Sequence, residues 1–113
     1  MALKRVVVTG IGTLKPIGNN LHDYWNNLLA GVSGAAPITL FDASKFKTRF
    51  ACEIKGFDPT EFMDRKEARK LDRFAQIALV ASDQAVLDAG ITKDNVDHDR
   101  VGVIFASGIG GLT

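Results

Sequence analysis

The sequence predicts an α/β fold, because short β-branched runs that end in glycine alternate with stretches of helical periodicity. Residues 4–9 form the first such run, ended by Gly10 and Gly12, and residues 100–107 form another that leads into further glycines. Between these runs lies the longest helical pattern of the chain, over residues 65–89. We therefore expect a buried strand near each end, with a long helix between them.

A shorter helix is expected over residues 21–30. Asn19 or Asn20 can cap its N-terminus, and Gly31 is suited to end it in the left-handed conformation that glycine tolerates. Its apolar face would consist of Tyr24, Trp25, Leu28 and Leu29. After a loop, apolar and polar residues alternate weakly over residues 50–54, which predicts a short strand.

The long helix over residues 65–89 has clear end signals. Asp64 stands at the N-cap with Glu67 three residues later, a capping box with Asp in place of Ser or Thr, and Gly90 follows the last residue. One stripe at helical spacing is apolar and rich in alanine: Leu71, Phe74, Ala75, Ala78, Ala81, Ala85 and Ala89. So many small side chains predict close packing of this helix against another element.

Composition excludes several classes of protein. The net charge of +1 gives no general attraction to nucleic acid, and no apolar run approaches the ~20 residues needed to cross a membrane. Gly10 and Gly12 interrupt the first apolar run too early for a signal peptide. The single cysteine, Cys52, cannot form an internal disulfide, which favours a cytoplasmic location.

The first glycine turn invites a dinucleotide-binding interpretation, but the spacing argues against it. The third glycine of that fingerprint would fall at Lys15, and Pro16 follows at once, so no helix opens there. His22 and His98 have no partners at metal-ligand spacing. These spacings therefore predict neither a dinucleotide site nor a metal site.

Cys52 is a poor candidate for a nucleophile. A reactive thiol needs a basic partner or a helix N-terminus to lower its pKa. Glu53 follows Cys52 directly, and its carboxylate disfavours a thiolate. We therefore expect Cys52 to be a buried structural residue.

A basic cluster lies at the start of the long helical pattern. Lys66, Arg69, Lys70 and Arg73 have the spacing of one helix face. Cations in the first turns of a helix are disfavoured by about 0.3–1 kcal/mol each. The cluster therefore indicates either a negatively charged partner or a solvated charged face, and the residues alone leave both open.

Six segments of the chain are informative when they are taken in order. They are V-V-V-T-G-I-G at 6–12, P-I-G-N at 16–19, W-x-x-L-L-A-G at 25–31, F-D-A-S at 41–44, R-K-E-A-R-K-L-D at 65–72 and S-G-I-G-G at 107–111. Together they resemble the opening of the bacterial β-ketoacyl-[acyl-carrier-protein] synthases of type II, which are thiolase-like condensing enzymes. The resemblance implies two similar α/β halves in α-β-α-β-α layers, usually as a homodimer. Residues 1–113 would be the N-terminal part of the first half, an incomplete domain.

The resemblance also implies an activity, namely fatty-acid elongation by decarboxylating Claisen condensation of acyl and malonyl thioesters carried on acyl carrier protein, without a cofactor. The nucleophilic cysteine of the family lies in a T-A-C motif, and that cysteine, two histidines and a lysine would all fall beyond residue 113. We therefore expect no catalytic residue in this chain and no activity of the chain alone.

The resemblance implies two sites within the chain. Lys66, Arg69 and Lys70 would contact the acidic carrier protein, and Ile109 would line and gate the acyl pocket, although Ile109 could also be an ordinary packing residue. Lys15 departs from the family, which usually has a small hydroxyl residue at this position. A non-catalytic module that binds a carrier protein or another acidic partner remains the alternative.

Overall fold

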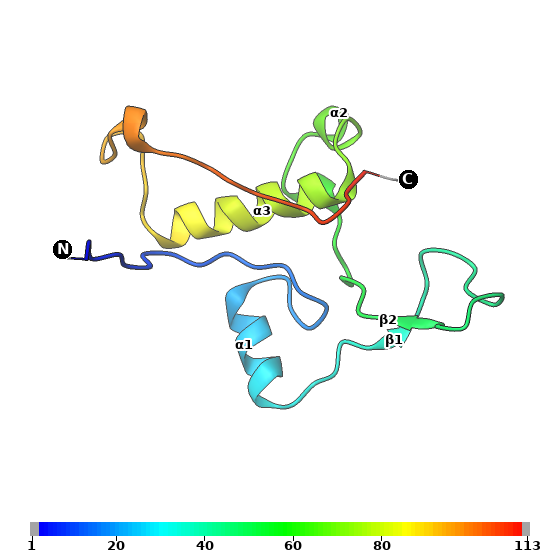
Figure 1. Ribbon diagram of the computed structural model, residues 1–113. Coiled ribbons are helices and arrows are strands. Elements are labelled where there is room, and N and C mark those ends of the chain that lie inside the picture. Colours follow the sequence, from blue (N-terminus) through cyan, green and yellow to red (C-terminus); the bar gives the residue numbers. More distant parts are fainter. Residues whose placement is uncertain (1–2, 112–113) are drawn as a thin grey trace.

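The structure is a computed structural model that describes residues 3–111 (Figure 1). Its elements, in order, are α1 (Leu21–Leu29), β1 (Ala36–Pro37), β2 (Phe50–Ala51), the 3-10 turn η1 (Pro59–Glu61), α2 (Arg65–Ala68), α3 (Arg73–Asp88) and the 3-10 turn η2 (His98–Arg100). Strands β1 and β2 pair antiparallel, with Ala36 opposite Ala51. No helix within the described range is long and apolar enough to cross a membrane.

Helix α1 confirms the prediction for residues 21–30 almost to the residue. The Asn20 side chain accepts a hydrogen bond of 2.9 Å from the backbone N–H of Asp23, so Asn20 is the N-cap. Gly31 follows with a φ of +68°. The Asn27 side chain donates to the carbonyl of Ile17 at 2.7 Å, which ties the helix to the loop before it.

The prediction of one helix over residues 65–89 is wrong, because the chain turns between α2 and α3. Asp72 has an extended backbone (φ −64°, ψ 155°), and a 3.3 Å bond from Leu71 N–H to the Ala68 carbonyl closes the turn. The two ends of the pattern are nevertheless confirmed: Asp64 caps α2 through a 2.7 Å bond from Lys66 N–H, and Gly90 follows α3 with a φ of +64°.

The segments predicted as terminal strands were residues 4–9 and 100–107. Residues 4–9 and 101–107 are extended but unpaired, and Arg100 belongs to η2, so the prediction of sheet strands there is wrong for this chain. A sheet strand forms backbone hydrogen bonds with a neighbouring strand. Within residues 3–111 neither of these two segments has such a neighbour. Both segments run opposite to the direction of α3 (Figure 1). The third predicted strand, residues 50–54, is confirmed only as the two residues of β2.

The alanine stripe of α3 is packed against the first glycine turn, which confirms the predicted close packing. A Cβ built on Gly10 would stand 2.5 Å from the backbone nitrogen of Ala89, and one on Gly12 would stand 2.6 Å from that of Ala85. Real side chains do not approach backbone so closely. Glycine is therefore needed at both positions for the segment to lie on the helix.

Polar side chains of α3 hold the same segment by its backbone. Asp88 accepts from Ile11 N–H at 2.9 Å, and the Gln84 side chain accepts from Thr13 N–H at 3.0 Å. The Gln84 amide also donates to the Asn19 carbonyl at 2.9 Å. These bonds fix the register of residues 11–19 along the helix.

The buried core is small. It consists of Leu14, Phe57 and Val80, with Ile54, Met63, Ile77 and Ala81 packed around them. Many large apolar side chains elsewhere are exposed, and Ile104 retains 96 % of its accessible surface. Many large apolar side chains among the described residues are thus open to contact.

Candidate functional site

The three cations of the predicted docking site lie on α2 and the turn that follows it. Lys66 is in the first turn of α2, Arg69 is its C-cap, and Lys70 lies in the turn; all three are exposed. The prediction that they share one helix face with Arg73 is wrong, because the helix ends before Arg73. In the described range the one contact within 4.0 Å between a basic and an acidic side chain joins His22 and Asp23, so all three cations are free to meet an acidic partner.

Arg73 has a different role. Its guanidinium lies 5.4 Å from the centre of the Phe57 ring and donates at 3.5 Å to the Ile54 carbonyl. A cation over an aromatic face is held by the ring quadrupole. Arg73 therefore ties α3 to the loop that carries Phe57. It is exposed, but it lies on a different element from Lys66, Arg69 and Lys70.

The second glycine turn lies over the N-terminus of α3. Gly110 and Gly111 have φ values of +60° and +55°, and a Cβ built on Gly110 would stand 2.9 Å from the Phe74 ring. Both left-handed conformation and close contact require glycine here. Ile109, just before them, is 78 % exposed. The turn is thus closely packed on α3, whereas the Ile109 side chain next to it is exposed.

An apolar groove of about 320 Å³ runs between α3 and the last extended segment. Its walls include Phe74, Ala78, Val103 and Phe105. Ile109 is not among the residues that line it. The groove and the Ile109 side chain are therefore separate apolar features of this end of the molecule.

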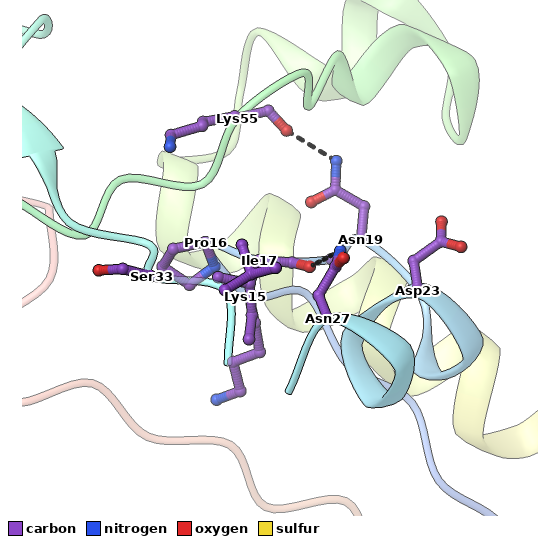
Figure 2. A pocket seen from close by; sticks show the side chains of 10 residues that line it. Lys15, Pro16, Ile17, Asn19, Asp23, Asn27, Ser33 and Lys55 are labelled. Atoms are coloured by element: carbon purple, nitrogen blue, oxygen red, sulfur yellow. Dashed lines mark hydrogen bonds between the residues drawn. The ribbon is translucent and has the colours of Figure 1, made fainter. Parts of the chain in front are cut away.

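A second hollow, of about 370 Å³, is lined in part by the loop that contains Lys15 (Figure 2). Paired backbone bonds between Lys15 and Gly18, of 2.8 and 3.0 Å, close a tight turn around Pro16. No helix opens there, as the sequence predicted. In Figure 2 the Lys15 side chain points downward, away from Lys55, so the view does not bring their ammonium groups together as one anion site. Lys15 is exposed, which explains how this loop accommodates a long cation.

Cys52 is exposed, so the prediction that it is buried is wrong. It directly follows β2, which pairs with β1 alone in the two-stranded sheet of residues 3–111. Its neighbour Glu53 accepts hydrogen bonds from the Thr39 hydroxyl at 2.7 Å and from the Thr39 and Leu40 amides. These bonds, the hydroxyl first, hold the pKa of Glu53 below its ordinary value.

Residues 3–111 bring no three His, Cys, Asp or Glu side chains together in a way that could hold a metal ion. His22 contacts Asp23 and Asn26, and His98 contacts the Lys93 carbonyl at 2.8 Å. The histidines thus have local partners at the surface.

The sequence matches the family described as "Beta-ketoacyl synthase, N-terminal domain" over residues 3–113. The chain belongs to this family. Two curated relatives carry the name 3-oxoacyl-[acyl-carrier-protein] synthase 2. That of Synechocystis sp. is 52 % identical over 109 residues, which are 96 % of this chain and 26 % of the relative. That of Coxiella burnetii is 47 % identical over 112 residues, 99 % of this chain and 27 % of the relative.

A solved structure, "The ishigamide ketosynthase/chain length factor", superimposes with a TM-score of 0.75 at 40 % sequence identity, over 84 % of this chain and 24 % of that one. The chain therefore has the fold of the corresponding part of a ketosynthase, and the family resemblance stated from the six segments is confirmed. It spans about a quarter of the length of the relatives it matches.

Proposed function

We propose that this chain is the N-terminal part of a 3-oxoacyl-[acyl-carrier-protein] synthase 2, with the complete enzyme arranged in α-β-α-β-α layers as a cytoplasmic homodimer. The observation that carries the proposal is the family match over residues 3–113, with about half of the residues identical to two synthases of that name. The complete enzyme would elongate acyl chains that are bound to acyl carrier protein.

The proposed reaction is a decarboxylating Claisen condensation. An acyl group passes from its carrier to a cysteine thiol, a malonyl thioester loses carbon dioxide, and the resulting carbanion attacks the acyl thioester and expels the thiolate. Cys52 follows Phe50-Ala51 and not the Thr-Ala of the family's T-A-C motif, so we do not assign the nucleophile to it. We assign the nucleophile and its supporting histidines to the longer enzyme and expect this chain alone to be inactive.

The proposed docking site for the carrier protein is the unpaired trio Lys66, Arg69 and Lys70. All three are exposed, and none has a carboxylate within 4.0 Å in the described range. Charge complementarity of this kind mainly steers encounter and selects the partner. It is also weakened by salt, since exposed charges are screened over about 8 Å at physiological ionic strength.

Ile109 is our candidate for the wall of the acyl pocket. Two observations support this. The Ile109 side chain is exposed, and the glycines that follow it pack against Phe74, which fixes the position of the turn. An acyl chain would gain about 25 cal/mol for each Å² of apolar surface it buries there.

A carrier-binding module without chemistry is the second candidate, because the same three unpaired cations would serve it equally well. The two candidates differ in one respect. Only the first predicts that the longer protein releases carbon dioxide and forms a carbon–carbon bond.

Charge reversal tests the docking assignment. In the longer enzyme, the variant Lys66→Glu/Arg69→Glu/Lys70→Glu should raise the KM for carrier-bound substrates by at least about fivefold. A matched control, Lys45→Glu/Lys47→Glu/Lys93→Glu, makes the same change in net charge at exposed lysines on other loops. Equal KM values in the two variants would refute the assignment.

A further inference from the structure

The Gln76 side chain joins the two sides of the helix break. Its amide nitrogen donates to the Ala68 carbonyl at 2.8 Å and to the Leu71 carbonyl at 3.1 Å. Ala68 is the last residue of α2, and Leu71 lies in the turn. At the break the Ala68 carbonyl loses its i+4 donor and keeps a 3.3 Å turn bond from Leu71 N–H, so Gln76 supplies it with a second donor.

This contact cannot exist in an unbroken helix. Gln76 and Ala68 are eight residues apart, which in a continuous helix separates them by about 12 Å along the axis. Residues 65–89 contain neither glycine nor proline, so local preference favours the continuous form. Asp72 at the N-cap of α3 makes no side-chain capping bond. The Gln76 amide is therefore a side-chain contact that specifically favours the broken form.

The break between α2 and α3 determines how the basic residues are arranged. In a continuous helix Lys66, Arg69 and Lys70 would lie on one stripe with Arg73, whereas in the structure they lie on a separate single turn and its C-terminal connection. Helix α2 has four residues, too few to persist without tertiary support. Its orientation therefore depends on the contacts that fix the turn, and Gln76 makes two of them.

We propose that Gln76 is a positioning residue for carrier-protein docking, acting by holding α2 and the turn in the arrangement that presents Lys66, Arg69 and Lys70. This rests on the proposed function. It predicts an effect on substrates attached to the carrier protein and none on the same acyl groups attached to coenzyme A, which lack the acidic partner.

The test compares two substitutions in the longer enzyme. Gln76→Met keeps the length of the side chain and removes the donor. Gln84→Met is the matched control, since Gln84 lies on the same helix, is also half-buried, and also makes two hydrogen bonds, but to Thr13 and Asn19. Steady-state KM is measured for carrier-bound and coenzyme A-bound substrates. KM does not depend on how much of the enzyme is folded, so partial loss of stability does not distort the comparison.

The expected result is a rise in the carrier-bound KM on the order of fivefold in Gln76→Met, with the coenzyme A-bound KM within about twofold of wild type and Gln84→Met unaffected in both. Gln76→Asn keeps the amide but shortens its reach, and it should behave similarly if the methionine variant does not fold. An equal change for both substrates, or no change, overturns the proposal. Because charge reversal of the three cations tests docking separately, a loss there with a normal Gln76 variant would refute this inference alone.

Discussion

Gly12 and Ala85 approach so closely that no side chain fits between them: a Cβ on Gly12 would stand 2.6 Å from the Ala85 backbone nitrogen. Gly12→Ala should therefore push the first extended segment away from α3. Overpacking against a rigid backbone typically costs about 1–3 kcal/mol. Thermal unfolding of the longer enzyme measures the effect. Gly102→Ala, where no atom lies within 4 Å, is the control, and an equal shift in the two variants would contradict this account.

Glu53 should contribute to stability in a pH-dependent manner. The Thr39 hydroxyl, and then the Thr39 and Leu40 amides, keep the folded-state pKa of Glu53 below its ordinary value of 4.5. The contribution is therefore present above that value and is lost as the pH falls through the lowered pKa. The difference in urea midpoint between wild type and Glu53→Gln should be largest near neutral pH and should shrink in acid. A difference that stays constant with pH would count against the Thr39 contact.

Cys52 should be open to modification and dispensable for catalysis. It is exposed, so a thiol reagent should label it in the folded protein. The proposed nucleophile lies elsewhere in the longer enzyme, so Cys52→Ser should retain the wild-type kcat within about twofold. A loss of burst-phase acylation in this variant would show that Cys52 does take part.

The isolated chain should self-associate. Val6, Val8, Val103 and Ile104 retain 78 to 96 % of their accessible surface, and the extended segments that carry them have unpaired backbone groups. Exposed apolar surface next to unpaired strand-like backbone favours association between copies. Light scattering on the purified chain should report large or mixed species. A monodisperse monomer with a cooperative melting transition would contradict this expectation.

Features with local causes were predictable from the sequence. Asn20 and Asp64 cap their helices through bonds to residues two or three positions away, and Gly31 and Gly90 follow helices with the positive φ that glycine favours. The alanine stripe of α3 likewise predicted close packing, because small side chains along one face of a helix allow another element to approach it closely.

Features with tertiary causes were not predictable. The break after Ala68 depends on an amide eight residues further on, and no local pattern reports such a contact. The contact of Arg73 with the Phe57 ring likewise joins two separate segments of the chain. The exposure of Cys52 and the missing ladders of residues 4–9 and 100–107 depend on which neighbours are present, and a strand pattern does not encode them.

The central claim is that Lys66, Arg69 and Lys70 receive an acidic carrier protein on the longer synthase. The most direct measurement is the dissociation constant of acyl carrier protein for that enzyme at several salt concentrations. The wild-type affinity should fall as salt rises, and Lys66→Glu/Arg69→Glu/Lys70→Glu should bind at least about tenfold more weakly with a flatter salt dependence. An unchanged affinity and salt dependence in that variant would contradict the account.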